Sequence, residues 1–133
     1  MHLGARQRLA VKRAVAEAEE ATGLQLCVYV GPAEGDSRAR AEELFVAAGL
    51  DTRPAVLVLV APSEHRVEVV TAPSVRSRLD DATCAAAVER MTGRFAAGDL
   101  AGGLVAGVRF LADAAGRGTG PPDAVELPDL LDG

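Results

Sequence analysis

Charged side chains gather in the segment TAPSVRSRLDDATC, residues 71–84, which follows a strand-like run. Arg76 and Arg78 stand just before the adjacent acids Asp80 and Asp81. Carboxylate oxygens are the ligands that Ca²⁺ and Mg²⁺ prefer, whereas the forked guanidinium group of arginine binds phosphate or carboxylate. Aspartate is also a preferred N-cap of a helix. The segment therefore has both a chemical and a structural interpretation.

Two chemical versions of a site follow from these residues and their expected neighbours. In the first, three carboxylates supply oxygens to Ca²⁺ or Mg²⁺: Asp51, Asp80 and Asp81. In the second, three guanidinium groups hold a phosphate or carboxylate, helped by helix N-terminal amides: Arg53, Arg76 and Arg78. The structural alternative stays open, in which an aspartate caps the helix and the arginines are solvated or pair with the acids.

Other residues have weaker claims to chemistry. His65 could act as a general acid or base, but it stands in a predicted turn, where a solvated histidine is the simpler interpretation. The loop GPAEGD, residues 31–36, lacks the spacing of a phosphate-cradling P-loop. Ligands of open α/β sheets often lie beyond the carboxyl ends of strands, which gives a small independent claim to the residues after strand one: Asp36, Ser37, Arg38 and Arg40. Their structural alternative is an N-cap followed by solvent-facing arginines.

The last part of the chain suggests a different role. GRGTGPP from Gly116 predicts a flexible linker, and DAVELPDLLDG predicts a short acidic and hydrophobic tail. Apolar residues among acids are typical of a segment that docks on a protein partner: Val125, Leu127, Leu130 and Leu131. The alternative is that residues 116–133 dock on their own domain or stay loose.

The elements that must position these residues alternate between helix and strand. Apolar spacing predicts helices over 5–21 and 37–48, strands over 24–30, 55–61 and 65–71, and two helices separated by Gly98 and Asp99. The strand–helix–strand unit predicts a parallel pair, and the short turn PSE predicts that the third strand runs antiparallel to the second. Strand one is apolar on both faces, which favours a place inside the sheet.

The predicted fold class is therefore α/β: a small mixed sheet of at least three strands, the first two parallel and the third antiparallel, covered by helices in a single domain over 5–115. In this topology the starts of strands one and two and the end of strand three meet at one end of the sheet. The residues expected there are Thr22, Asp51, Arg53, Thr71, Arg76, Arg78, Asp80 and Asp81. Gly103 and Gly107, one turn apart, predict that the last helix lies close to a neighbour.

Composition limits the function classes. The 133 residues carry a formal net charge of −5, and nucleic-acid binding normally needs a basic surface, so no nucleic acid is expected. No run reaches the roughly 18 apolar residues of a membrane span, and no signal peptide is evident. Cys27 and Cys84 are typical of buried thiols in a reducing compartment. These features predict a soluble, cytoplasmic protein without a structural zinc site.

Several segments together resemble the TPM domain, known as TPM phosphatase-like: EATGLQLCVYVG, DSRARAEELF, AVLVLVAPSEHRVEVVT, RLDD and FAAGDLAGGLVAGVRFLAD. They span roughly residues 8–114 and look closest to a short, unanchored actinobacterial branch of unknown function. The resemblance implies a Rossmann-like α/β/α sandwich, and weak acid phosphatase activity or calcium binding in some members. Other members act as accessory factors for membrane complexes. Many members carry an acid just before strand two, where this chain has Arg53.

Two functional hypotheses follow. The first is a non-enzymatic TPM-like interaction or accessory module of unknown pathway, because no polar catalytic constellation is evident. The alternative is a weak metal-assisted acid phosphatase, a phosphomonoesterase, or a calcium-binding TPM domain that uses Asp80 and Asp81. Apart from a possible Ca²⁺ or Mg²⁺ ion, the sequence predicts no cofactor.

Overall fold

The structure is a computed structural model that describes residues 2–116. The tail residues predicted to bind a partner lie outside the described residues: Val125, Leu127, Leu130 and Leu131. Within residues 2–116, four helices and three strands follow one another in the order α1 (Ala5–Thr22), β1 (Gln25–Val30), α2 (Ser37–Ala47), β2 (Ala55–Ala61), β3 (Arg66–Thr71), α3 (Asp81–Ala96) and α4 (Leu100–Ala115). Short 3₁₀ turns precede β2, join β2 to β3, and follow β3.

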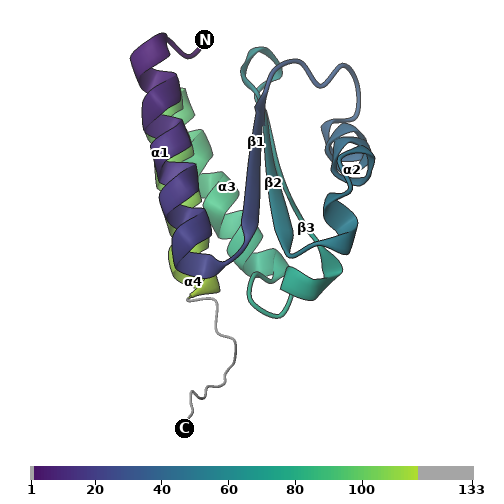
Figure 1. Ribbon diagram of the computed structural model, residues 1–133. Helices are drawn as coiled ribbons and strands as arrows, with labels where there is room; N and C mark the ends of the chain where they lie inside the picture. The colour runs from purple at the N-terminus through teal and green to yellow at the C-terminus, as the bar shows by residue number, and fades with distance from the viewer. Residues whose placement is uncertain (1, 117–133) are drawn as a thin grey trace, which may run out of the picture.

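The described strands form one mixed sheet in the order β1–β2–β3. β1 runs parallel to β2 with Gln25 opposite Ala55, and β3 runs antiparallel to β2 with Thr71 opposite Val56. Helices α1, α3 and α4 cover one face of the sheet and α2 covers the other (Figure 1). All seven residues of β2 are buried, as expected for a central strand between two helical layers. The predicted α/β fold, with its parallel and antiparallel pairings, is confirmed.

The prediction that β1 lies inside the sheet is wrong for the described residues. There β1 pairs with β2 alone and so forms an edge of the sheet. Its two faces still carry apolar residues, because α1 packs on one side of the strand and the sheet also lies under α2. Burial on both faces reports the layers above and below a strand and says nothing about its neighbours in the plane of the sheet.

The helices begin and end where local signals predict. Asp36, Asp80 and Asp99 accept hydrogen bonds from backbone amides at the starts of α2, α3 and α4. Gly23 follows α1 with a φ of 75°, a left-handed conformation that glycine adopts without strain, and its N–H donates to the Glu19 carbonyl. These caps fix the positions of the loops at both ends of the sheet.

α3 and α4 pack against each other at very short range. A side chain at Gly107 would meet the Met91 Cγ at 2.5 Å, and one at Gly103 would overlap the Phe95 ring. The predicted close approach of α4 to a neighbour is confirmed. The predicted inward residues of α4 are all buried: Leu100, Leu104, Val108 and Leu111. No helix in residues 2–116 combines the length and the apolar character needed to cross a lipid bilayer.

Candidate functional site

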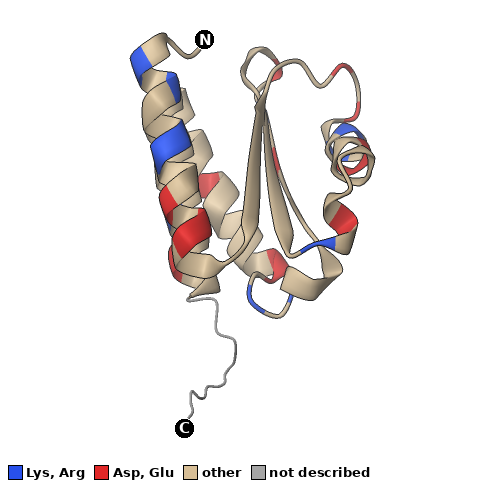
Figure 2. Cartoon of the chain, in the orientation of Figure 1, with Lys and Arg blue, Asp and Glu red and all other residues tan. Residues whose placement is uncertain are grey.

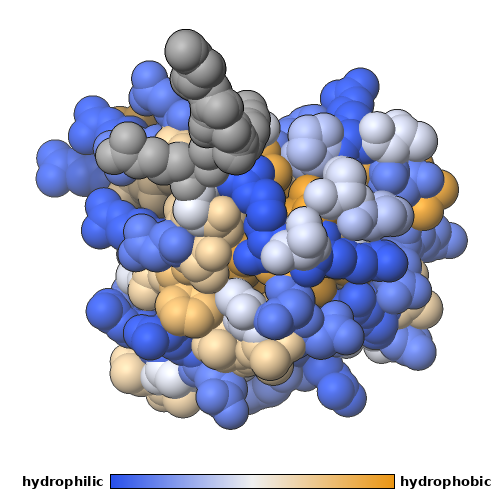
Figure 3. Space-filling model, turned by 90° about the horizontal axis from the view of Figure 1, so that it is seen from below, coloured by the Kyte–Doolittle hydropathy of each residue, from blue (hydrophilic) through white to orange (hydrophobic). Residues whose placement is uncertain are grey.

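The end of the sheet where β1 and β2 start and β3 finishes contains most of the charged residues predicted to form a site. The strand register places Gln25 beside Ala55 and Thr71 beside Val56, so the three strand ends do meet there. Figure 3 looks onto this lower end, where hydrophilic residues are interspersed with apolar ones. The contacts of each predicted residue decide whether this end is a binding site or a structural junction.

Arg78 serves as a structural tie. Its Nη2 donates to the carbonyl oxygens of Thr22 at 3.0 Å and Gly116 at 2.8 Å, and its Nε donates to that of Ala115 at 3.1 Å. These carbonyls belong to the C-terminal ends of α1 and α4, where unpaired C=O groups and the helix dipoles favour a cation. Arg78 therefore joins two helix ends, and its part in the predicted anion site stays a prediction.

The other two arginines of the predicted anion site, Arg53 and Arg76, lie in different surroundings. Arg53 Nη1 donates to the Gln25 side-chain oxygen at 3.3 Å. Arg76 is exposed and lines a different cavity beside β3. The structure therefore gives each of the three predicted arginines separate surroundings, and anion binding by this set stays a prediction.

The three predicted metal ligands are likewise not grouped. Asp80 caps α3 by accepting from the Thr83 amide at 2.9 Å, and hydrogen bonds from Thr83 lower the pKa of its carboxyl. Asp51 lies exposed in the turn before β2. Within residues 2–116, no three His, Cys, Asp or Glu side chains lie close enough together to hold a metal ion. The structural alternative accounts for Asp80, and cation binding by Asp51, Asp80 and Asp81 stays a prediction without a preformed cluster.

A cavity of about 500 Å³ runs along the outer side of β3 and contains Arg76, Asp81 and Arg38. Cys84 also lines it, but burial and the charge of Asp81 raise the pKa of its thiol, while Arg38 lowers it less. A raised pKa keeps the thiol protonated and makes it a poor nucleophile. Both cysteines are half-buried and free. The cavity gathers charges but shows no activated nucleophile.

The Arg38 side chain covers part of the backbone at the β3 edge. Its Nη1 donates to the Val69 carbonyl at 2.8 Å, and its Nε pairs with Glu42 at 3.0 Å. Next to it, the Ser37 hydroxyl donates to Glu68 at 2.6 Å. The structural alternative thus accounts for the residues after β1, since Arg40 also pairs with Glu43 on the surface of α2. His65 is exposed in the turn between β2 and β3, as the sequence predicts.

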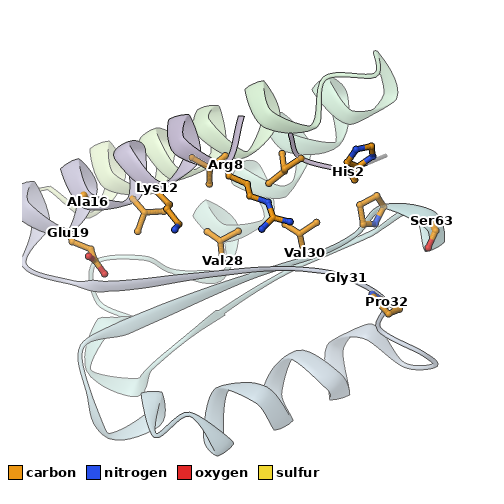
Figure 4. A pocket seen from close by; sticks show the side chains of 14 residues that line it. His2, Arg8, Lys12, Ala16, Glu19, Val28, Val30, Gly31, Pro32 and Ser63 are labelled. Atoms are coloured by element: carbon orange, nitrogen blue, oxygen red, sulfur yellow. The ribbon is translucent and has the colours of Figure 1, made fainter. Parts of the chain in front are cut away.

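A hollow larger than the cavity beside β3 lies between α1 and the open edge of β1. It has a volume of about 700 Å³ and is lined by α1, by β1 and by the β2–β3 turn. We call it the α1–β1 groove and define it by six of its lining residues: Arg8, Lys12, Val15, Glu19, Val28 and Val30. In Figure 4, Arg8 and Lys12 extend from α1 toward β1, while Val28 and Val30 point from the strand toward the helix. α1 packs chiefly against α4, which leaves this space beside β1.

The backbone of β1 adds polar groups that point away from β2, on the side of the groove. The amides of Gln25 and Gly31 donate toward β2, so the alternate residues Leu26, Val28 and Val30 direct their N–H and C=O groups away from it. Glu19 accepts from the Leu26 amide at 2.9 Å. Val28 and Val30 thus present their backbone at an open edge, within a cavity that can admit an extended chain.

The charges on α1 run against the helix dipole. Basic residues occupy its N-terminal half and acidic residues its C-terminal half (Figure 2), and no acid stands in its first turn. Cations at a helix N-terminus are unfavourable, and Arg8 and Lys12 repel each other one turn apart. Neither forms an ion pair with a described residue. Sequence reasoning missed this groove, although the basic half of α1 was a readable signal.

Comparison with known proteins places the chain in a family. A family model described as a domain of unknown function, DUF5130, matches residues 2–112. The chain belongs to this family. An uncharacterized protein of Mycobacterium tuberculosis, found in strains CDC 1551 and H37Rv, is 30% identical over 105 residues, which are 77% of this chain and 61% of that protein. The family is established on this basis, and the TPM resemblance stays a prediction.

Solved structures share the fold of this DUF5130 chain at low identity. The NMR structure of the BA42 protein from Bizionia argentinensis matches with a TM-score of 0.80 and 20% identity, covering 96% of this chain and 92% of that one. The N-terminal domain of a P. gingivalis protein matches with a TM-score of 0.74 and 19% identity, covering 84% and 75%. The N-terminal domain of cg2496 from Corynebacterium glutamicum matches at 0.69 and 14%, covering 86% and 74%. These likenesses concern the fold alone.

Proposed function

We propose that this protein is a non-enzymatic interaction module, and that the α1–β1 groove binds an extended, acidic and apolar peptide segment of a protein partner. The peptide adds a strand to β1 and places alternate apolar side chains against Val28 and Val30. The observation that carries the proposal is the coincidence of an open strand edge with a cavity of about 700 Å³ directly above it.

Each part of the groove has a role in such binding. The outward N–H and C=O groups of Val28 and Val30 supply main-chain hydrogen bonds, as in β-strand addition. Val15 and the two β1 valines supply apolar contact for every second residue of the ligand. Arg8 and Lys12 at the upper half of the groove attract acids and discriminate against basic segments.

The arrangement of charge on α1 supports a binding role over a stabilising one. A helix selected only for stability would place acids in its first turn, and a pair such as Arg8 and Lys12 costs about 0.2–0.5 kcal/mol as an exposed like-charge pair. Departures from local rules are typical of functional surfaces. An acidic ligand would relieve this repulsion and make the pattern favourable in the complex.

The TPM resemblance supports the same class of function. The sandwich implied by that family agrees with the fold, and some TPM members act as accessory factors. The competing phosphatase or calcium-binding function lacks a matching cluster in residues 2–116. Hydrolysis of p-nitrophenyl phosphate, with and without Ca²⁺ or Mg²⁺, tests that alternative. Turnover that is lost in Asp81→Ala at unchanged stability would replace the interaction module with an enzyme.

A peptide panel tests the proposal directly. The probes are synthetic nonapeptides with apolar residues at every second position and acids between or beside them, each matched by a copy with Lys in place of Asp and Glu. We expect the acidic members to shift the backbone amide resonances of Val28 and Val30 and to bind in the micromolar range, about −8 kcal/mol. The basic copies should bind at least about tenfold more weakly.

Matched variants locate the binding. The double variant Arg8→Glu/Lys12→Glu should lose the acidic peptides, whereas Arg6→Glu/Arg13→Glu, which makes the same charge change on α1 outside the groove lining, should retain most of the affinity. Binding that perturbs resonances around Arg76 and Cys84 in place of β1, or no binding by any panel member, would refute the proposed surface.

A further inference from the structure

The chain itself contains a segment with the chemistry that the α1–β1 groove selects. Residues 123–129, DAVELPD, place Asp123, Val125, Leu127 and Asp129 at every second position. In an extended strand such residues share one face. That face would read acid, apolar, apolar, acid: its two apolar residues match Val28 and Val30, and its acids match the cations Lys12 and Arg8, which extend over the groove.

The described part of the chain ends at a favourable place for this segment to enter the groove. Arg78 Nη2 donates to the carbonyl oxygens of both Gly116 and Thr22. The end of α4 therefore lies close to the residues that lead into β1. Figure 1 shows the same proximity of the ends of α1 and α4. The chain therefore continues from the start of β1, beside the lower end of the groove.

The connection is long enough. The eight residues 117–124 separate Gly116 from Val125, and an extended chain spans roughly 3.3 Å per residue, or about 26 Å for eight. β1 has six residues and is about 20 Å long. Val28 stands three residues, or about 10 Å, into β1, which is well within that span.

We infer that residues 123–127 of this chain occupy the α1–β1 groove as a strand parallel to β1, with Val125 opposite Val28 and Leu127 opposite Val30. In this register the Val28 amide donates to the Ala124 carbonyl and the Val30 amide to the Glu126 carbonyl, while the Glu126 amide donates to the Val28 carbonyl. Pro128 has no N–H and ends the pairing. The inference rests on the proposed function, because it makes the tail a tethered form of the peptide ligand.

A tethered ligand regulates the groove by competition. A linker of this length gives the tail an effective concentration in the millimolar range. A partner peptide must therefore displace residues 123–127, and its apparent affinity falls by the fraction of molecules in which the groove is open. Any event that withdraws the tail, such as its capture by another protein, exposes the strand edge.

Amide hydrogen exchange on the full chain, followed by NMR, tests the inference. The amides of Val28, Val30 and Glu126 should be protected in the native protein. Val125→Asp/Leu127→Asp should accelerate exchange at Val28 and Val30 by at least about tenfold, while the central-strand amide of Val58 stays unchanged. Leu130→Asp/Leu131→Asp adds the same charge beyond Pro128 and should change exchange at Val28 and Val30 less than about twofold.

A charge exchange gives an independent arm. Arg8→Glu/Lys12→Glu should release the tail and accelerate exchange at Val28 and Val30, and adding Asp123→Lys/Asp129→Lys should restore protection. Protection should also be independent of protein concentration over about a tenfold range, because the segment is attached to the same molecule. Protection that rises with concentration would instead assign the groove to the tail of a second copy and overturn the intramolecular inference.

The inference and the proposed function fail differently. Equal, fast exchange at Val28 and Val30 in the native chain and in Val125→Asp/Leu127→Asp overturns the inference. If the peptide panel still binds both proteins, the groove retains its proposed function without the tail. If the panel binds neither, both fail. We expect the panel to bind the variant more tightly than the native chain by the factor that separates their exchange rates.

Discussion

The two edge strands of the described sheet, β1 and β3, differ in how far other parts of the protein cover their backbone. At the β3 edge, α2 and α3 both contact the strand, and Arg38 donates to the Val69 carbonyl within an ion-pair cluster with Glu42 and Glu68. At the β1 edge, Glu19 accepts from the Leu26 amide, and beyond it the backbone of Val28 and Val30 faces a cavity. Proteins usually blunt exposed edges with charges or cover them. The strand addition proposed above requires a β1 edge of this kind, open to pairing.

The largest effect should come from Arg78, which supports the lower end of β1 by joining α1 to α4. Arg78→Met removes a cation from the carbonyls of Thr22, Ala115 and Gly116, and we expect a loss of about 2–3 kcal/mol of unfolding free energy. Urea denaturation measures it. Arg76→Met is the matched control, since Arg76 is exposed, and should cost less than about 0.5 kcal/mol. Equal costs would contradict the structural role of Arg78.

Removing the cap on the β1 edge should have the next largest effect. Glu19→Ala leaves the amide of the buried residue Leu26 without its acceptor, and we expect a loss of about 1–2 kcal/mol. Glu19→Gln keeps a side-chain oxygen and should recover most of it. Thermal denaturation, with the exposed neighbour Glu20→Ala as the control, measures the difference. If Glu19→Ala and Glu20→Ala have the same stability, the hydrogen bond from the Leu26 amide to Glu19 does not stabilise the β1 edge.

Removing the cap on the β3 edge should cost less. Arg38 is half exposed, and water can replace it at the Val69 carbonyl, so Arg38→Met should lower stability by about 1 kcal/mol. Arg40→Met loses only a surface pair with Glu43 and serves as the control. The comparison would be reversed if Arg38→Met made the β3 edge, in place of the β1 edge, the site where the acidic peptides bind.

The smallest effect has the opposite sign. Arg6→Glu replaces a cation with an acid in the first turn of α1 and should stabilise the protein by about 0.5 kcal/mol. Arg13→Glu makes the same change in the middle of the helix, where the dipole has little influence, and should gain less. A urea titration in low salt resolves the difference. A loss of stability in Arg6→Glu would mean that the basic half of α1 is explained by folding, which would remove one support for the binding role.

Most of the fold could be predicted from the sequence because its signals are local. The buried run AVLVLVA, the caps Asp36, Asp80 and Asp99, and Gly23 after α1 each specify an element without reference to distant residues. The meeting of the strand ends followed from chain direction alone and is confirmed by the register. Gly103 and Gly107 correctly indicated a close helix contact.

The contacts of the predicted site residues were harder to predict, because long side chains can form hydrogen bonds with groups that are far away in the sequence. Arg78 follows no pattern that reveals its use of three backbone carbonyls, which lie 37, 38 and 56 residues away. The groove depends on α1 packing against α4 more than against β1, and on β1 having an open side. Neither property is encoded in periodicity, which describes the faces of an element and not its neighbours within a layer.

The close interface between α3 and α4 also determines which parts of the molecule can change position. Helices α3 and α4 meet at Gly103 and Gly107, with Phe95 and Met91 packed directly against these glycines. Because this interface is already closely packed, we expect the two helices to move together as one rigid unit. α1, in contrast, borders the α1–β1 groove on its β1 side. Mechanical compliance should therefore concentrate at α1, and a guest of varying bulk would be accommodated by small rotations of that single helix while the rest of the layer keeps its shape.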